Sequence, residues 1–576
     1  MILQALTEYY ETMESRGEIA PPGWDQVRIS YALCIQEDGT LEQIIPLLES
    51  QPEDSKLRPQ SIELPAPVKK SSGITSNFLW ENSSYILGID NKGKPQRAQD
   101  CFAACRLLHE QLLTDVDSPA ARAVLAFFQC WQPEQAAEHP ALADCLEELL
   151  SGVNLLFRVN GAYVHEDPLV RKAWDAHYQA DNNAPSMICL VTGKKGPVEN
   201  IHPSIKKVYG AQSSGAALVS FNAPAFCSYG KEQNYNAPTS KYAAFAYTAA
   251  LNHLLDDRDH VYRIGDTTVV CWAKNGGSVY QDFMGWCSFG QEEPSYTLSE
   301  LQQALKELCA GNAVELNDEL LDPNMEFYVL GLSPNAARIS VRFFLRNSFG
   351  AFLQNIQKHQ QRLEIVRPVN DRFSTFPVWR LLSETVNPNS REKAASPNLA
   401  GELLRSILNN TYYPANLLQG VTLRIRAEHS ITAGKAAIIK AYYLKKPHRD
   451  VPKEVLTVSL NPDSANVPYN LGRLFSVLEA LQTAANPGIN TTIKDKYFNS
   501  ASATPSTVFP ILTNLAQKHL KKLDIGLRIY YDNQITDILS KLEENYPTHL
   551  NLPQQGSFQL GYYHQTQARF KKKGDQ

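Results

Sequence analysis

The hydrophobic pattern of the first third of the chain changes repeatedly between helical and strand-like spacing. Apolar residues within 2–10 recur at helical intervals, and residues 27–35 then alternate apolar and polar side chains as a half-buried strand does. Residues 51–73 are rich in Pro, Ser and Lys and predict a loop, which leads to a strand candidate at 85–89. Residues 97–152 have a helical, acidic pattern. This order predicts an α+β beginning.

Short apolar runs then predict further strands, at 155–159, 187–192 and 216–221. Residues 241–255 between them read as one helix. Gly265-Asp266 predicts the turn of a hairpin. We therefore expect a mixed sheet with added helices to extend to about residue 321.

Beyond residue 321 the chain is first rich in arginine and then helical. Residues 327–332 and 339–345 have strand-like patterns, and residues 348–363 and 433–444 have helical ones. The arginines of this stretch include Arg338, Arg342, Arg346, Arg424 and Arg426. From residue 451 onward, amphipathic segments separated by Pro and Gly are typical of a small helical bundle.

These patterns predict an α+β fold for a chain too long for one ordinary core. Three regions are expected: a mixed-sheet region with inserted helices at 1–321, a basic α+β and helical middle region at 322–450, and a C-terminal helical bundle at 451–576.

Net charge limits where nucleic acid could bind. The formal charge is -5 and the pI is about 6.3, whereas a protein that tracks DNA over its whole surface is normally basic. Residues 190–250 nevertheless hold six lysines and only two glutamates. Any contact with nucleic acid is therefore expected to be local.

Cysteine usage and hydropathy bear on the compartment. The ten cysteines form no C-x-x-C pair and none follows Cys309, which fits the reducing cytoplasm. No run approaches eighteen uninterrupted apolar residues, so no membrane span is predicted.

A search for catalytic motifs is mostly negative. Lys194-Lys195 lacks the glycine spacing of a phosphate-binding loop, and the serines of residues 210–215 lack the order of a nucleophile elbow. Cys101, Cys105 and His109 share one helix face and could ligate a metal, although packing residues around a hydrogen-bonded histidine are the simpler interpretation.

One acidic cluster leaves an enzymatic alternative open. Asp256, Asp257 and Asp259 lie beside His260, a composition that metal-dependent nucleases use, although a solvated helix end explains it more simply. No motif for cutting or unwinding DNA is recognisable, and we expect no enzyme activity and no cofactor.

Two polar loops carry chemistry suited to reading DNA. Residues 210–238 combine Gly, Ser, Asn and Gln with Lys231 and two tyrosines, which can bond to base edges and phosphates and can stack. Residues 69–82 place two lysines and small hydroxyl residues before Phe78 and Trp80. Both segments also suit structural loops, since these are ordinary turn residues.

At these residues the sequence resembles the Csd-type large-subunit family of the type I-C CRISPR interference complex (Cascade). The matching segments run from the first residues to the bundle: 1–6, 72–74, 77–80, 189–193, 210–238, 263–268, 472–475, 486–490 and 561–565.

The resemblance implies a non-catalytic subunit that recognises the protospacer-adjacent motif in duplex DNA and helps to open the duplex into an R-loop. The partners that it implies are the backbone and RNA-capping subunits, CRISPR RNA, target double-stranded DNA, a small helical subunit and a recruited helicase-nuclease. A lone Cys189 gives no support for the zinc site of some related large subunits, and no metal is predicted.

On the strength of this resemblance, the two loops supply candidate DNA contacts. They are Lys69, Lys70, Ser71, Ser72, Asn77, Ser213, Ser214, Asn222, Lys231, Gln233, Asn234 and Asn236. In the bundle, Lys518, Lys521 and Lys522, with Lys571–Lys573 at the end of the chain, would suit a displaced single strand, although a solvated helix face explains them equally well. A structural scaffold that does not read DNA is a further alternative.

Overall fold

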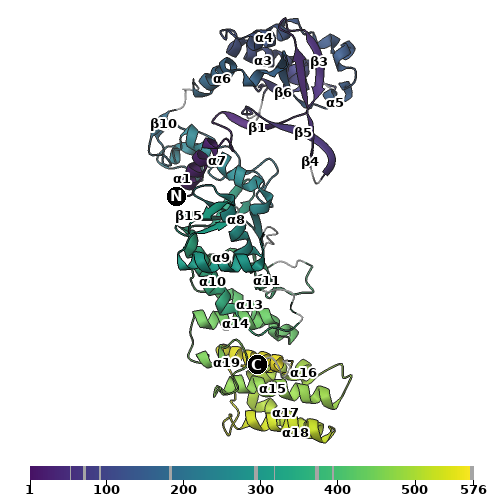
Figure 1. Cartoon of the computed structure of the whole chain (residues 1–576), viewed down its shortest axis with the longest axis vertical. Helices are drawn as coiled ribbons and strands as arrows, with labels where there is room; N and C mark the ends of the chain where they lie inside the picture. Colours follow the sequence, from purple (N-terminus) through teal and green to yellow (C-terminus); the bar gives the residue numbers. More distant parts are fainter. Residues whose placement is uncertain are drawn as a thin grey trace. The chain divides into compact units, whose positions relative to one another are not determined.

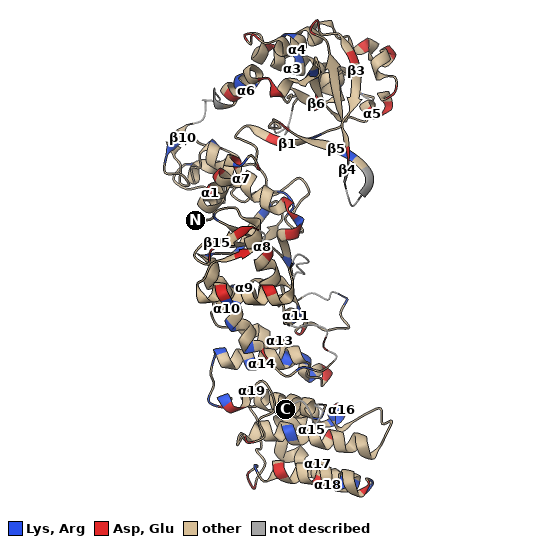
Figure 2. Ribbon diagram, viewed as in Figure 1, with Lys and Arg blue, Asp and Glu red and all other residues tan. Residues whose placement is uncertain are grey.

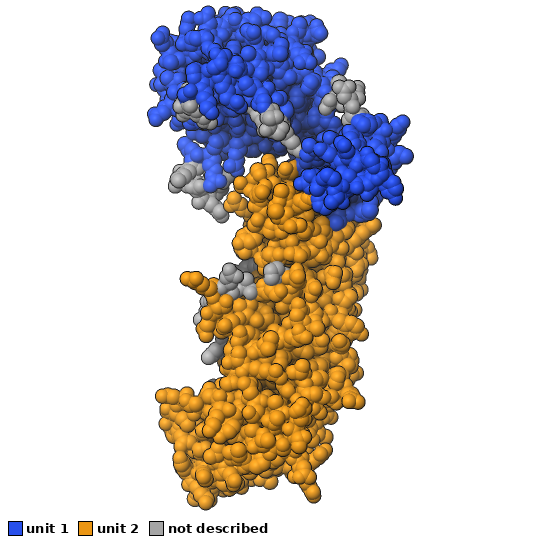
Figure 3. All heavy atoms as spheres, turned by 180° about the vertical axis from the view of Figure 1, so that it is seen from behind, with its two compact units in different colours: residues 1–203, 219–250 blue, residues 204–218, 251–576 orange. Residues whose placement is uncertain are grey.

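The structure is a computed structural model that describes residues 1–51, 54–68, 73–89, 93–180, 185–290, 296–316, 318–369, 371, 375–391 and 395–570. The chain forms two compact units, which are coloured separately in Figure 3. Unit 1 comprises residues 1–203 and 219–250, and unit 2 comprises residues 204–218 and 251–576. Helices and strands are mixed in the way that an α+β fold requires, as predicted (Figure 1).

Unit 1 is built on small sheets covered by helices. The larger sheet has the order β3-β2-β7-β6, from Leu41–Pro46, Tyr31–Ile35, Asn154–Val159 and Trp80–Asn82, with β8 (Ala162–Tyr163) paired to β7. β2 and β7 pair in parallel, and the neighbouring pairs are antiparallel. A second sheet pairs β1 (Trp24–Ile29), β5 (Asp54–Pro65) and β4 (Leu48–Gln51).

Helices complete unit 1 around an aromatic core. They are α1 (Ile2–Ser15), α2 (Ser83–Ile86), α3 (Pro95–Leu113), α4 (Pro119–Cys130), α5 (Leu146–Leu150), α6 (Pro168–Ala180) and α7 (Lys241–Asp256), of which residues up to Ala250 belong to this unit. Phe78, Phe128 and Phe157 pack around His109 of α3. A short ribbon, β9 (Ser186–Ile188) with β10 (Lys195–Pro197), precedes the polar segment.

Unit 2 begins with an antiparallel sheet in the order β11-β12-β15-β16, formed by Val261–Ile264, Thr267–Ala273, Glu326–Asn335 and Arg338–Ser348. The predicted turn at Gly265-Asp266 joins β11 to β12, and Gly265 has the positive φ of 64° that such a turn requires. Further elements are α8 (Ser278–Met284), α9 (Leu298–Ala310), a ribbon of β13 (Val314–Leu316) with β14 (Glu319–Leu321), and α10 (Phe349–Leu363).

The second half of unit 2 is helical. It contains α11 (Val378–Ser383), α12 (Pro397–Leu408), α13 (Ala415–Glu428), α14 (Ala433–Lys445), α15 (Val467–Ala485), α16 (Ile493–Ala503), α17 (Pro505–Leu520), α18 (Ile525–Leu539) and α19 (Leu552–Ala568). One continuous apolar core runs from β11 to α19. The predicted boundary between residues 450 and 451 falls inside this core, and the three-region division stays a prediction.

Several local predictions are wrong. Residues 27–35 were predicted to be one strand, but they divide between β1 and β2, which belong to different sheets. Most of residues 51–73 was predicted to be a loop, but β5 is a twelve-residue strand, because its backbone pairs with β1 on one side and β4 on the other. The apolar run at 85–89 overlaps helix α2, which Asn82 caps through its side chain. Residues 216–221 form only two isolated bridges instead of a strand.

No helix in the described parts of the chain is long and apolar enough to cross a membrane.

Candidate nucleic-acid interface

The first half of the predicted DNA-reading segment belongs to unit 2, where it is fixed to the main sheet. Ala217 forms a parallel bridge with Arg338 at the start of the edge strand β16, and Ile205 bridges Ala216 within the loop. The Tyr209 amide donates to Thr268 Oγ1 of β12 at 3.0 Å. Residues 204–218 therefore form a loop whose two ends and middle are all held by backbone contacts.

The tip of this loop presents polar side chains to solvent. Gln212, Ser213 and Ser214 are exposed, and the Gly215 amide donates to the Gln212 carbonyl at 2.9 Å to close a tight turn. Gly215 has φ +94°, and a Cβ there would lie 2.8 Å from Cβ of Ser204, so only glycine fits. The two serine hydroxyls can donate and accept without moving the backbone.

Cationic groups flank this tip. Arg263 of β11 lies over the Tyr209 ring at 3.2 Å from its centroid, and Lys206 is exposed while its amide is held by Asn252 Oδ1 at 2.8 Å. Lys207 is committed to an ion pair with Asp256. Arg263 and Tyr209 were not among the predicted contacts. The matching motif at residues 263–268 was the available signal, but only the fold shows that it lies against the loop.

The second half of the segment belongs to unit 1, where buried side chains hold it in place. Asn234 is only 3% exposed. Its Nδ2 donates to the Glu199 carbonyl at 2.7 Å and also contacts Nε2 of His202. Nδ1 of His202 lies 2.6 Å from the hydroxyl of Tyr247 on α7. Asn234 therefore supports the loop from inside rather than presenting its amide to a ligand.

Asn236 shapes the neighbouring turn through three hydrogen bonds. Its Oδ1 accepts from the Ser228 amide at 2.8 Å, and its Nδ2 donates to the carbonyls of Lys231 and Gln233 at 3.0 and 2.8 Å. Asn222, Lys231 and Gln233, by contrast, have exposed side chains. Of the predicted contacts in this half, these three are therefore placed to meet a ligand.

The other predicted contacts divide between buried residues and residues outside the description. Asn77 is 3% exposed, and its Oδ1 accepts from the Val68 amide at 2.9 Å. It braces the end of the second predicted loop instead of facing solvent. Lys69, Lys70, Ser71 and Ser72, together with Lys571–Lys573, lie outside the described residues.

The bundle lysines are exposed near the junction of α17 and α18. Lys518 lies in the last turn of α17, and both Lys518 and Lys521 are exposed. Lys522 Nζ donates to Asn486 Oδ1 at 2.8 Å. The single-strand contact at these lysines stays a prediction.

The arginines of the middle region are largely engaged within the fold. Arg342 pairs with Asp266 at 2.8 Å, Arg346 pairs with Glu326, and Arg424 pairs with Glu428 at 3.1 Å. Figure 2 likewise shows basic and acidic residues interspersed along the ribbon of each unit. This supports local rather than extended contact with nucleic acid.

The acidic cluster that suggested a nuclease is used for internal pairing. Asp256 pairs with Lys207, and His260 is held between Asp257 Oδ2 at 2.6 Å and Asp282 Oδ1 at 2.5 Å. Burial lowers the pKa of His260, but its hydrogen bonds to the carboxylates of Asp257 and Asp282 outweigh this effect and raise the pKa to about 9. Both ring nitrogens of His260 are thus engaged by carboxylates in the structure.

His109 is likewise occupied. Its Nε2 accepts from the Leu79 amide at 2.9 Å, and its Nδ1 donates to the Cys105 carbonyl at 2.8 Å. Burial lowers the pKa of His109 to about 4, which keeps it neutral. The hydrogen-bonded packing role is therefore the correct interpretation. Within the described residues, no group of three or more His, Cys, Asp or Glu side chains could hold a metal ion.

Unit 1 also contains an open cleft of about 740 Å³ between α1, residues 191–197 and α7. Lys194, Lys195 and Lys241 line one part of it, but Glu8 and Glu11 line another. Carboxylates in the same cleft repel phosphate, so this cleft is a poorer candidate for nucleic acid than the exposed loops.

Comparison with known proteins adds one match. The model of a family described as CRISPR-associated protein (Cas_Csd1) matches residues 6–570. No curated protein matches the chain.

Proposed function

The chain belongs to the Csd1 family of CRISPR-associated proteins, and we propose that it is the large subunit of an RNA-guided type I-C Cascade that reads the protospacer-adjacent motif. In this proposal the subunit makes the protein contacts to a short duplex motif, while the guide RNA reads the remaining target by base pairing. It then promotes unwinding into an R-loop and recruits a separate helicase-nuclease.

The observation that carries the proposal is the loop at residues 204–218. Its polar tip is exposed, its backbone is fixed to a sheet, and cationic side chains lie next to it. A rigid, mostly neutral tip loses little conformational entropy when it binds, and hydroxyl and amide groups match the donors and acceptors of base edges. Asn222, Lys231 and Gln233 of unit 1 supply a second exposed set.

We propose that the subunit is not catalytic. In the predicted cluster, Asp256 pairs with Lys207, and His260 is bonded to Asp257 and also to Asp282, so three of its four members are engaged within the fold. Cleavage is assigned to the recruited helicase-nuclease. The remaining partners in the proposal are the backbone and RNA-capping subunits, CRISPR RNA and a small helical subunit.

The acidic net charge fits this division of roles. A protein with a formal charge of -5 has weak general affinity for DNA, so binding depends on a few local contacts and on the assembled complex. Isolated subunit is therefore expected to bind duplex DNA poorly, and the complex is the right object for experiments.

The test measures the affinity of the reconstituted complex for duplexes that differ only in the flanking motif, at fixed salt. A Ser213→Ala/Ser214→Ala variant should lose motif preference by about 1–3 kcal/mol for each base contact removed. Lys231→Ala should weaken all duplexes alike and reduce the salt slope by about 0.9. Ser299→Ala and Lys306→Ala, at exposed positions of α9, are matched controls.

Two outcomes would contradict the proposal. If the wild-type complex binds all flanking sequences equally, the subunit is a structural scaffold. If the loop variants behave like the α9 controls, motif reading lies elsewhere in the complex.

A further inference from the structure

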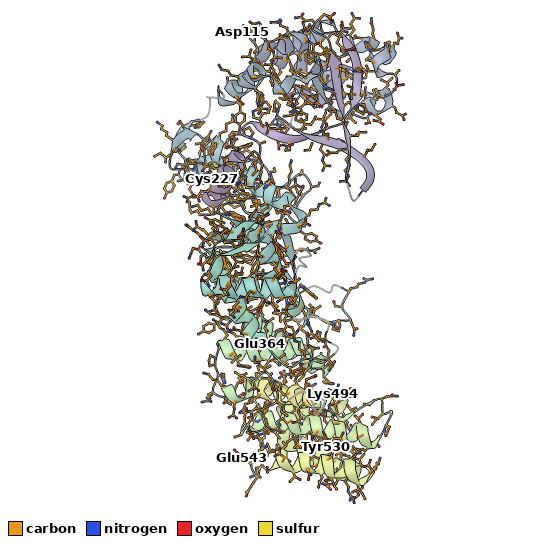
Figure 4. All side chains as sticks on the ribbon, viewed as in Figure 1. Asp115, Cys227, Glu364, Lys494, Tyr530 and Glu543 are labelled. Carbon is orange, nitrogen blue, oxygen red and sulfur yellow. The ribbon has the colours of Figure 1, made fainter. Side chains whose placement is uncertain are left out.

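One aromatic side chain in unit 1 stands almost completely in solvent. Tyr229 is 98% exposed, the highest value of any large apolar or aromatic residue in the described parts of the chain. Single exposed apolar residues are ordinary on protein surfaces, but a ring this exposed contributes no burial to folding and is available to a ligand. Cys227, labelled in Figure 4, lies two residues before it.

The backbone at Tyr229 makes the choice of residue more unusual. Tyr229 and Gly230 have φ values of 54° and 68°, and the Lys231 amide donates to the Ser228 carbonyl at 3.0 Å. Two successive positive φ values under such a bond define a type I′ turn, whose first central position favours Asn, Asp or Gly. Tyrosine is disfavoured there because its Cβ crowds the backbone. The turn's own geometry therefore does not explain the ring.

The turn is fixed in its conformation by side chains behind it. Asn236 bonds to the backbone of Ser228, Lys231 and Gln233, so one side chain ties both arms of the turn together. Asn234 and His202 anchor the following 3-10 turn at Gln233–Asn236 to Tyr247 of α7. Because the turn is rigid, the position of the exposed ring is fixed before binding, and little conformational entropy is lost when it binds.

The surroundings of the ring favour a nucleic acid over a protein surface. Ser228, Lys231, Glu232 and Gln233 beside it are all exposed and polar. Aromatic anchors of protein interfaces pack among residues that exclude water, whereas the side chains at 228 and 231–233 are polar and exposed, and Phe226 is the one other exposed large apolar residue in the described segment 219–238 besides Tyr229. Stacking on a base requires only a π-face and tolerates polar neighbours, and the exposed Lys231, two residues along the chain, supplies a cation for a phosphate.

We infer that Tyr229 stacks on a base that is exposed beside the recognition motif when the duplex opens, and thereby holds the opened state. This inference rests on the proposed function, because it places Tyr229 at the DNA end that the polar loops read. Tyr229 acts on a base of any identity, so it contributes to opening and not to motif choice.

The experiment uses the reconstituted complex with duplexes that carry 2-aminopurine at the pairs next to the motif. Fluorescence of this base rises when it unstacks from its neighbours, so it reports local opening. Each duplex is prepared fully paired and also with a short mismatched bubble at the same pairs. Tyr229→Ala, Tyr229→Phe and Asn236→Ala are compared with Tyr412→Ala, a control at another tyrosine that is 65% exposed.

The inference predicts a specific pattern. Tyr229→Ala should lower affinity for the fully paired duplex by about 5- to 150-fold, the range that one base–aromatic stack supplies. It should lower affinity for the bubble duplex by at least as large a factor, because the same stack forms on the unpaired base there, and it should leave motif preference unchanged. Tyr229→Phe should behave like wild type because the ring is kept, and Asn236→Ala should fall between the two.

Three results would overturn the inference. They are equal affinity of Tyr229→Ala and wild type for paired duplexes, a loss on paired duplexes that bubble duplexes do not share, and a failure of the Tyr229→Ala subunit to assemble, as measured by mass photometry. The last would identify the ring as a protein contact. Loss of motif discrimination by the wild-type complex is a separate result, which removes the proposed function instead.

Discussion

The packing of the C-terminal helices makes a sharp prediction about a single methyl group. α15 and α19 cross where each helix carries a glycine: a Cβ on Gly472 would lie 1.9 Å from the Phe558 carbonyl oxygen, and a Cβ on Gly561 would lie 2.0 Å from that of Tyr469. The two backbones therefore touch directly at this crossing. Gly472→Ala should force them apart.

The size of the effect follows from these distances. Ordinary contact for a Cβ begins near 3.4 Å, so the helices must separate by about 1.5 Å, and the atoms in the way are backbone atoms that cannot rotate aside. Overpacking of this kind costs about 3 kcal/mol, the upper part of the usual range. The higher helix propensity of alanine relative to glycine offsets about 1 kcal/mol of this destabilisation. A net loss of about 2 kcal/mol is expected.

The assay must report on these helices. All seven tryptophans lie at or before Trp379, so tryptophan fluorescence does not follow the bundle. Hydrogen exchange of peptides from α15 and α19, together with urea unfolding followed by circular dichroism, is suitable. Gly526→Ala on α18 is the matched control, because its Cβ would meet only Asp524 Oδ1 at 3.4 Å, and it should be neutral or stabilising. If Gly472→Ala exchanges as slowly as this control, the close crossing is refuted.

Three further predictions concern the histidines and the nuclease alternative. The folded-state pKa of His260, about 9, exceeds its unfolded value near 6.5, so the stabilisation that its protonated form provides is complete below about pH 6.5 and is lost as pH rises through 9. In urea titrations, the stability deficit of His260→Gln relative to wild type should therefore shrink between pH 6.5 and 9.5. A deficit that stays constant over this range would contradict the prediction. His109→Leu should cost about 1–3 kcal/mol, measured by thermal unfolding, because the buried Leu79 amide loses its acceptor, and a neutral result would show that another group replaces it. Purified protein with Mg²⁺ or Mn²⁺ should not cleave DNA, whereas cleavage that Asp257→Asn abolishes would restore the nuclease.

Much of the regular structure could be predicted because its signals are local. Helices α7, α10 and α14 and strands β7, β15 and β16 lie where their periodicity placed them, since each has one apolar face or run that decides the element by itself. The Gly265-Asp266 turn was predictable for the same reason. The strand β5 was not, because its stability comes from pairing with β1 and β4 on both sides, partners that its own Pro, Ser and Lys residues do not indicate.

The sequence alone was also sufficient to indicate the family, a polar segment at residues 210–238 and the weakness of every catalytic motif. It could not distinguish Asn234, Asn236 and Asn77, which hold the backbone, from Ser213, Lys231 and Gln233, which face solvent. Asparagine has the same donors and acceptors whether they meet a base or a neighbouring carbonyl. Which of the two they meet depends on burial and on contacts between residues distant in the chain, and only the tertiary structure decides those.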